Sequence, residues 1–376
     1  MKPPAKPFSL LIKPASADCN QNCVYCFYLN RADPYPGRRR RMSAEVLERL
    51  VSSYLKTSQP RYTFVWQGGE PTLMGVDFFK EAVKLQRACA APGSTVVNGL
   101  QTNATRIDDE FARFFAGNGF LLGVSLDGPA RIHDRYRKYR NGAGSYADVM
   151  KGIDCLARNG VEFNILTLVS RANVKKGGEI YRFLCEKGFF YQQYIECVDF
   201  DEKGRLSPCS ITAEEWGNFL CEVFDEWIKS DVHRVSIRFF DAVLAYLVEK
   251  RYTICSMGPA CGQYVAVEFN GDVYPCDFFV REDLRIGNIE KNTWRELLES
   301  SVLTAFAARK SEGGDPCVPC RYRSLCFGDC PKNRFRFNRP SDGPSWLCQG
   351  WKTFYDHALP RFQIMAEEII RNRGPF

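Results

Sequence analysis

The sequence predicts an α/β fold in two domains: an open, partial (β/α)6 barrel over residues 1–232 and a loop-rich domain over residues 233–376. Three observations lead to this prediction. Short apolar runs alternate with amphipathic helical patterns from residue 8 to about residue 230. After residue 232 the alternation ends. Eleven of the 17 cysteines fall into two spaced sets, one in each part of the chain.

Six apolar runs are the expected strands; they cover residues 8–13, 62–66, 95–101, 120–126, 161–169 and 191–196. Six amphipathic stretches are the expected helices; they cover residues 43–57, 76–90, 108–116, 145–158, 174–187 and 212–229. Ser43 precedes a helical apolar stripe and fits an N-cap. Repeated strand–helix units imply parallel strands joined by right-handed crossovers. In such barrels the chemistry lies at the carboxyl ends of the strands.

Unusual polar and glycine residues follow the expected strands. They are the first cysteine set, Gly68-Gly69-Glu70, Thr102 with Asn103, Ser125 with Asp127, and Cys197 with Val198. Because parallel strands end at the same edge, we expect these residues to collect on one rim of the barrel.

The second domain begins with a hairpin signal. Residues 264–269 and 272–276 flank Asn270-Gly271, which predicts a turn of the type I′ kind. A helix is expected over residues 292–301, and another over about 357–372. The cysteine-dense segment 313–350 between them has little apolar periodicity, so it needs metal ligation to hold a shape.

Composition excludes several classes of protein. The chain has 376 residues and a net charge of +7, with acidic residues spread among the basic ones, so we expect no nucleic-acid partner. We see no signal peptide and no apolar run long enough to cross a membrane. A cytoplasmic location follows, and there cysteines are metal ligands or catalytic thiols rather than disulfides. Nothing requires more than a monomer.

The two cysteine sets predict three [4Fe–4S] clusters. Cys19, Cys23 and Cys26 can hold one cluster and leave one iron open for a cofactor or substrate. Eight further thiolates can fully ligate two more clusters; they are Cys255, Cys261, Cys276, Cys317, Cys320, Cys326, Cys330 and Cys348. The alternative is structural zinc, which takes four ligands per site, so three thiolates fit it poorly.

The first set, C-x3-C-x-Tyr25-C, resembles the signature of the radical SAM superfamily, and Gln67-Gly68-Gly69-Glu70-Pro71 resembles its glycine motif. The resemblance implies that S-adenosyl-L-methionine chelates the open iron and is cleaved to a 5′-deoxyadenosyl radical. It also implies cofactor contacts at Tyr25, Gly69, Ser125, Arg137 and Val198. Leucine is common at the position of Val198, and a backbone contact would survive that change. Considered alone, Arg137 would be an ordinary surface arginine.

The second set is similar to the SPASM extension of radical SAM enzymes that modify peptides and proteins. That pattern has seven cysteines, and Cys255 supplies an eighth. The resemblance assigns Cys255, Cys261, Cys276 and Cys330 to an inner auxiliary cluster. It assigns Cys317, Cys320, Cys326 and Cys348 to an outer one. The spacing alone leaves this partition open.

Asp277 directly follows Cys276 and is the candidate general base. A cluster ligand fixes the backbone beside it, so the carboxylate is held in position. The alternative is an aspartate at the end of a hairpin that accepts hydrogen bonds from nearby backbone amides.

Eight segments of the chain resemble the anaerobic sulfatase-maturating enzymes, and the match runs from about residue 8 to residue 365. The segments are IKPAS, CVYCFYL, WQGGEPTL, LQTNAT, VSLDGP, EFNIL, RVSIRFFD and VYPCDF. The resemblance implies oxidation of a cysteine or serine in a sulfatase Cys/Ser-x-Pro-x-Arg motif to formylglycine. A hydrogen atom is taken from Cβ, and Asp277 is the base. The implied partners are the sulfatase polypeptide, bound as an extended segment, and an electron donor such as flavodoxin or ferredoxin.

Two alternatives stay open at this point. The first is a peptide-modifying radical enzyme that forms thioether or carbon–carbon cross-links; many such enzymes carry a leader-binding domain, which we do not expect before residue 8. The second is a non-catalytic binding module whose fold is stabilised by bound metal. This alternative predicts zinc in place of iron.

Overall fold

A computed structural model describes residues 7–29, 34–35, 40–201, 204–311, 315–336, 339–340 and 343–373. The chain divides into two compact units. Unit 1 comprises residues 1–125, 137–163 and 262–307, and unit 2 comprises residues 126–136, 164–261 and 308–376. These units are defined by spatial contact, and the division at residue 232 stays a prediction. Among the described residues, no helix is long and apolar enough to cross a membrane.

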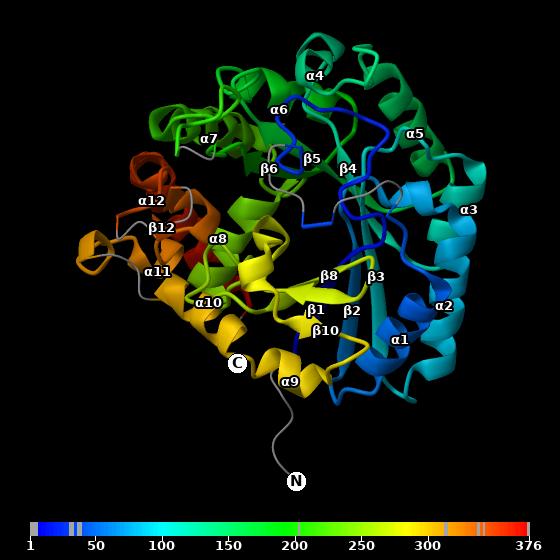
Figure 1. The fold of residues 1–376 in the computed structure, drawn as a ribbon. Coiled ribbons are helices and arrows are strands. Elements are labelled where there is room, and N and C mark those ends of the chain that lie inside the picture. The colour runs from blue at the N-terminus through cyan, green and yellow to red at the C-terminus, as the bar shows by residue number, and fades with distance from the viewer. Residues whose placement is uncertain are drawn as a thin grey trace. The chain divides into compact units, whose positions relative to one another are not determined.

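Unit 1 is built on a sheet with the strand order β10-β9-β8-β1-β2-β3-β4 (Figure 1). The strands are β1 (Ser9–Lys13), β2 (Arg61–Trp66), β3 (Thr95–Thr102), β4 (Leu121–Ser125), β8 (Tyr264–Glu268), β9 (Asp272–Tyr274) and β10 (Gly287–Asn288). From β8 to β4 the neighbours are parallel, whereas β8–β9 and β9–β10 are antiparallel. The predicted strands β1 to β4 are confirmed.

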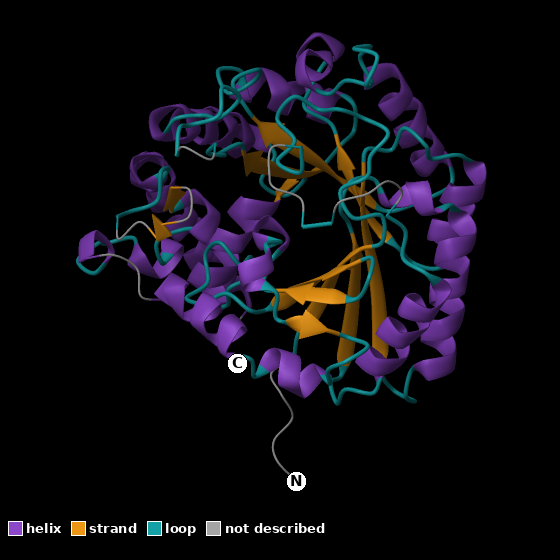
Figure 2. Cartoon of the chain, in the orientation of Figure 1, coloured by secondary structure: helices purple, strands orange, loops and turns teal. Residues whose placement is uncertain are grey.

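Helices form the outer layer of unit 1 and strands the inner layer (Figure 2). The helices are α1 (Ala44–Leu55), α2 (Val76–Cys89), α3 (Asp109–Gly117), α5 (Tyr146–Arg158) and α9 (Trp294–Leu298), while α10 (Ser301–Ser311) continues into unit 2. Short 3-10 turns lie at Pro71–Met74, Asp277–Phe279 and Glu282–Leu284. Ser43 caps α1 as predicted, because its Oγ accepts a hydrogen bond from the Val46 N–H at 3.3 Å.

Aromatic side chains fill the core beneath these helices. Tyr54 of α1 packs edge-on against Phe64 of β2, and Trp66 packs edge-on against Phe79 of α2. The Tyr54 hydroxyl also donates to the carbonyl of Phe8 at 2.7 Å, so this large ring is buried with its polar atom satisfied. The apolar faces predicted for α1 and α2 are therefore the faces that cover the sheet.

Unit 2 contains the parallel strands β5 (Phe163–Val169, whose first residue belongs to unit 1), β6 (Tyr191–Glu196) and β7 (Ser236–Ile237). Its helices are α4 (Ala130–Tyr136), α6 (Gly177–Glu186), α7 (Ala213–Ser230), α8 (Arg238–Glu249), α11 (Arg323–Cys326) and α12 (Cys348–Arg373). It also contains 3-10 turns at Asp315–Cys317 and Pro331–Asn333 and the short strands β11 (Phe335–Arg336) and β12 (Arg339–Pro340). Strands β5 and β6 and helices α6 and α7 confirm the prediction; β7, α4 and α8 were not predicted.

The C-terminal helix is longer than predicted. It begins at Cys348 rather than near residue 357 and runs through Pro360. Its buried side chains include Trp351, Phe354, Ala358 and Phe362, and their helical spacing explains why the helix starts early. The last cysteine is therefore the first residue of a helix rather than part of a loop. Parts of the segment 313–350, at residues 313–314, 337–338 and 341–342, lie outside the described residues.

The hairpin at Asn270-Gly271 is present, but its turn is not of type I′. Strands β8 and β9 are antiparallel, with Val267 opposite Val273. Gly271 has φ +84°, whereas Asn270 is not among the residues with positive φ, and type I′ requires positive φ at both. The Gly271 N–H donates to the Glu268 carbonyl at 2.9 Å, so the loop is longer than two residues.

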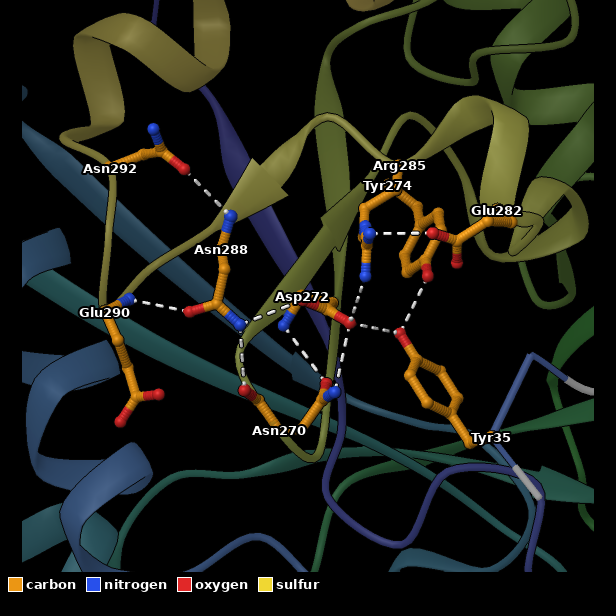
Figure 3. A network of polar contacts seen from close by, with 9 residues as sticks. All are labelled: Tyr35, Asn270, Asp272, Tyr274, Glu282, Arg285, Asn288, Glu290 and Asn292. Carbon is orange, nitrogen blue, oxygen red and sulfur yellow. Dashed lines mark hydrogen bonds and ion pairs between the residues drawn. The ribbon is translucent and has the colours of Figure 1, made fainter.

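A polar network ties this hairpin to the segment that follows the first cysteine set (Figure 3). The Tyr35 hydroxyl lies 2.9 Å from Asp272 Oδ2 and 2.7 Å from the Tyr274 hydroxyl. Asn288 of β10 donates to Asp272 Oδ1 at 2.9 Å and to the Asn270 carbonyl at 3.0 Å. The network therefore holds Tyr35 against the hairpin that leads to Cys276.

Candidate active site

The three cysteines of the first set lie on the loop after β1. Cys23 is buried, and Cys19 and Cys26 are half-buried. The Cys26 N–H donates to the Cys23 carbonyl at 2.9 Å, and Asn103 Nδ2 lies 3.6 Å from Cys19 Sγ. Burial, with the nearby charge of Glu70, raises the pKa of Cys19 to about 12. Iron binds the thiolate form of cysteine, so cluster binding is coupled to loss of the thiol proton.

The donor set fits an iron–sulfur cluster. In the part of the chain that the structure describes, no three cysteine, histidine or carboxylate side chains converge closely enough to hold a single metal ion. A four-iron cluster does not need such convergence, because each of its irons takes its own thiolate. Three soft sulfur ligands on one short loop are the chemistry that such a cluster requires.

Gly68 and Gly69 bring the loop after β2 into contact with the cysteine loop. The Gly69 N–H donates to the Ser16 carbonyl at 2.7 Å, and the Glu70 N–H donates to the Asp18 carbonyl at 2.8 Å. A Cβ atom added at Gly69 would lie 2.0 Å from the Asp18 carbonyl oxygen. Glycine is therefore required at this position for the two loops to meet directly before Cys19.

Glu70 is fully buried and is a residue whose role sequence reasoning missed. Its Oε2 accepts from the Asn103 N–H at 2.7 Å. Its Oε1 accepts from the Thr72 hydroxyl at 2.7 Å and from the Thr102 hydroxyl at 2.8 Å. Burial raises the pKa of Glu70, while these hydrogen bonds favour its charged form. The carboxylate joins the loops after β2 and β3 and so places Asn103 beside the cysteine loop.

Glu70→Gln is expected to destabilise the iron-loaded enzyme by roughly 1–3 kcal/mol, because the amide nitrogen would face groups that are themselves donors. The midpoint of urea unfolding measures this change. Asp77→Asn is the matched control, because the Asp77 side chain is 92% exposed and its loss should shift the midpoint little. Equal midpoints for the two variants would show that Glu70 does not join the loops.

Tyr25 and Arg137 lie together. Both are cofactor contacts that the resemblance to the radical SAM superfamily implies. Arg137 is 8% exposed, so it is not the surface arginine that its sequence position alone favoured. Its Nη1 donates to the Tyr25 hydroxyl at 2.8 Å. The Asn22 N–H also donates to the Lys138 carbonyl at 2.7 Å. The segment at Arg137 is thus fastened to the cysteine loop, and its guanidinium is next to the aromatic residue between two cysteines.

The other two proposed cofactor contacts lie at strand ends. Ser125 is the last residue of β4, and its Oγ accepts a hydrogen bond from Gln101 Nε2 at 3.1 Å. Val198 belongs to unit 2, where it is buried two residues after β6. Both positions agree with the prediction that functional residues follow the strands.

Asp277 is buried, with 4% of its surface exposed, at the start of a 3-10 turn after β9. Gln67 Nε2 donates to Asp277 Oδ2 at 3.2 Å. The Tyr264 hydroxyl lies 3.0 Å from Cys276 Sγ and 3.5 Å from Asp277 Oδ1. Side chains therefore hold this carboxylate. The alternative reading, an aspartate at the end of a hairpin that is bonded by backbone amides, does not describe these contacts. Sequence reasoning missed Gln67 and Tyr264 in this role.

The remaining seven cysteines of the second set lie in unit 2 and fall into two neighbourhoods. Burial raises the pKa of Cys330, and the nearby Cys255 thiol adds to the effect. Burial also raises the pKa of Cys348, and there the neighbouring thiols are Cys317 and Cys320. The partition of the eight cysteines between the two auxiliary clusters stays a prediction.

Lys310 is a further residue that the sequence did not single out. It is buried, and its Nζ donates to the carbonyls of Cys255 at 2.5 Å and Ser256 at 2.8 Å. Cys255 itself is exposed. The lysine therefore holds the chain at the first cysteine of this set.

Comparison with known proteins agrees with this geometry. The Radical SAM superfamily matches residues 14–184, and the SPASM iron–sulfur cluster-binding domain matches residues 255–331. The serine-type anaerobic sulfatase-maturating enzyme of Bacteroides thetaiotaomicron is 36% identical over 394 residues, covering 99% of this chain and 94% of that protein. The cysteine-type enzyme of Clostridium perfringens is 36% identical over 368 residues, covering 96% of this chain and 99% of that protein.

A solved structure, native anSMEcpe with bound AdoMet, superimposes with a TM-score of 0.90 at 36% identity, covering 96% of this chain and 100% of that chain. SuiB of Streptococcus suis bound to S-adenosylmethionine has a TM-score of 0.64 at 16% identity, covering 91% of this chain and 77% of that chain, which shows a shared fold only.

These matches define a radical SAM enzyme with a SPASM iron–sulfur domain, and they confirm the predicted fold class. The chain belongs to the family of anaerobic sulfatase-maturating enzymes. This membership favours the predicted activity over cross-link formation, and it rules out the non-catalytic binding module.

Proposed function

We propose that the enzyme oxidises a cysteine or serine in the Cys/Ser-x-Pro-x-Arg motif of a sulfatase to formylglycine, without oxygen. The observation that carries this proposal is the buried Asp277, adjacent to the cluster ligand Cys276 and held by Gln67 at 3.2 Å. The curated relatives include serine-type and cysteine-type enzymes at equal identity. Solved relatives also hold AdoMet together with the Kp18Cys or Cp18Cys peptide.

The proposed role of each residue follows from its surroundings. Asp277 accepts the proton from the thiol or hydroxyl of the target residue, and its fixed orientation favours that transfer. Gln67 and Tyr264 hold the carboxylate in place. Arg137, which Tyr25 orients, faces the cofactor carboxylate as a charge-assisted donor. Gly69 and Ser125 contact the cofactor from the loops after β2 and β4, and Val198 does so through its backbone.

The proposed cofactors are S-adenosyl-L-methionine and three [4Fe–4S] clusters, one held by Cys19, Cys23 and Cys26 and two by the eight later cysteines. When bound, they supply the radical that removes a hydrogen atom from Cβ and the acceptor for the electron left on that carbon. With cysteine as the target, the resulting thioaldehyde is hydrolysed to formylglycine by water.

The proposal extends to partners and location. A low-potential one-electron carrier such as flavodoxin or ferredoxin is the proposed donor. We also propose a monomeric, cytoplasmic enzyme, because eleven cysteines reserved for iron need a reducing compartment and all come from one chain. A radical SAM domain over residues 1–232 and a SPASM domain over residues 233–376 complete the proposal.

Anaerobic incubation of the reconstituted enzyme with paired peptides tests the function. The two peptides are identical except for Cys or Ser at the first position of the Cys/Ser-x-Pro-x-Arg motif. We expect the cysteine peptide to lose one sulfur and two hydrogens and to gain one oxygen, the serine peptide to lose two hydrogens, or both, with 5′-deoxyadenosine formed in proportion. A cross-linked product, or neither change with iron and cofactor present, would refute the proposal.

A further inference from the structure

Lys13 and Glu268 form a buried ion pair to which the proposed reaction assigns no role. Lys13 is 2% exposed and Glu268 is 0% exposed. They are the last residues of β1 and β8, and the parallel register places them side by side. The Lys13 ammonium donates to Glu268 Oε1, and it also lies 4.6 Å from the centre of the Tyr28 ring. Two charges removed from water in this way are costly unless their remaining hydrogen-bonding capacity is used.

The second carboxylate oxygen of Glu268, Oε2, can still accept hydrogen bonds. Glu268 Oε2 is buried and accepts no hydrogen bond from any residue that the structure describes. Buried carboxylate oxygens in folded proteins are nearly always paired with a protein donor or with ordered water. A donor other than the described residues is therefore expected at this oxygen.

Glu268 is one of the residues that line a small cavity. Its volume is about 40 Å³, and its lining includes Lys13, Tyr28, Glu268 and Asp277. The hairpin network holds Tyr35 in place (Figure 3). Tyr35 also lines this cavity. A cavity of this size has room for at least one water molecule, and the polar groups in its lining can bind it.

We propose that this cavity holds an ordered water that donates one hydrogen bond to Glu268 Oε2 and the other to the carboxylate of Asp277. Ionised carboxylates only accept hydrogen bonds, so two of them cannot pair directly, and water supplies the two donors that they lack. The Lys13 ammonium offsets the second negative charge. Glu268 is then a positioning residue for Asp277.

This inference rests on the proposed function, because it assigns Asp277 an orientation suited to the reaction. Gln67 at 3.2 Å and the distant Tyr264 hydroxyl at 3.5 Å leave acceptor positions on Asp277 unused. The bridging water fills one of them and prevents the carboxylate from rotating. Loss of the bridge therefore affects the rate of turnover and not the binding of the peptide.

Two double variants test the bridge, and only one of them keeps an acceptor oxygen at position 268. Lys13→Met with Glu268→Leu removes both charges and the acceptor; Lys13→Met with Glu268→Gln removes both charges and keeps an acceptor. Removing the charges together avoids an unpaired buried ion. We expect the leucine variant to lose roughly 10- to 100-fold in kcat with little change in the peptide KM. It should also form more 5′-deoxyadenosine per formylglycine.

The glutamine variant should recover most of that loss at equal iron content. Equal kcat and equal coupling in the two variants would overturn the proposal. If either variant fails to retain iron, electron density of the anaerobic wild-type enzyme decides: a water within hydrogen-bond distance of both carboxylates supports the bridge, and its absence refutes it. If wild-type enzyme makes no formylglycine, the proposed function fails, while the density still tests the water independently.

Discussion

Asparagine in place of Asp277 is expected to lower the rate of formylglycine formation by roughly 10²–10⁴-fold. The substitution keeps the size of the side chain and an oxygen that can accept from Gln67, but it removes the acceptor for the substrate proton. All three clusters should be retained, because Asp277 is not a thiolate ligand. The measurement is anaerobic turnover of the cysteine and serine peptides, read by mass, with iron content determined on the same preparation.

Measuring cofactor cleavage distinguishes an enzyme that has lost only its general base from one whose active site is damaged. Asp277→Asn should still form 5′-deoxyadenosine, since the first cysteine set and Gly69 are unchanged. Asp283→Asn is the matched control: this aspartate lies six residues later, its side chain is 61% exposed and it pairs with Arg281 at the surface. It should behave as wild type. An Asp277→Asn enzyme with full formylglycine yield would remove Asp277 as the base.

Strands and helices could be predicted where one local pattern decides them. The alternation of apolar runs and amphipathic stretches predicts the first six strands. Burial is continuous along most of β1 and β4, whereas β2, β3, β5 and β6 bury mainly alternate residues. The C-terminal helix is longer than predicted: Cys348 belongs to the cysteine-dense segment that predicts a loop, although Trp351 and Phe354 directly after it follow helical spacing. The hairpin prediction is confirmed, but the predicted type I′ turn is wrong, because only Gly271 and not Asn270 has a positive φ.

The candidate site could be predicted as residue types but not as contacts. Asp277 and the cysteines stand out by spacing, whereas Gln67, 210 residues from Asp277, carries no local signal. Lys13 and Glu268 are 255 residues apart, and only the pairing of β1 with β8 brings them together. Charged residues at strand ends are usually solvated, so neither could be identified as buried before the register of the sheet was known.

Gly69→Ala is expected to abolish turnover, with a loss of at least about 100-fold in both cofactor cleavage and formylglycine formation. The new Cβ would lie 2.0 Å from the Asp18 carbonyl oxygen and 2.4 Å from the Asp18 carbonyl carbon, and both are backbone atoms that cannot rotate away. The cysteine loop must therefore shift directly before Cys19. About a third of the iron should be lost, since one of three four-iron clusters depends on this loop.

Gly117→Ala is the matched control for this prediction. Gly117 is the last residue of α3, a Cβ added there would meet nothing within 4 Å, and its φ lies outside the left-handed region. Alanine also favours a helix over glycine by about 1 kcal/mol, so this variant should keep its iron and its activity. Iron content, 5′-deoxyadenosine and formylglycine are measured for both variants. Wild-type values in Gly69→Ala would mean that the two loops do not meet as closely as described, and the role of Gly69 beside the cofactor would be lost with that contact.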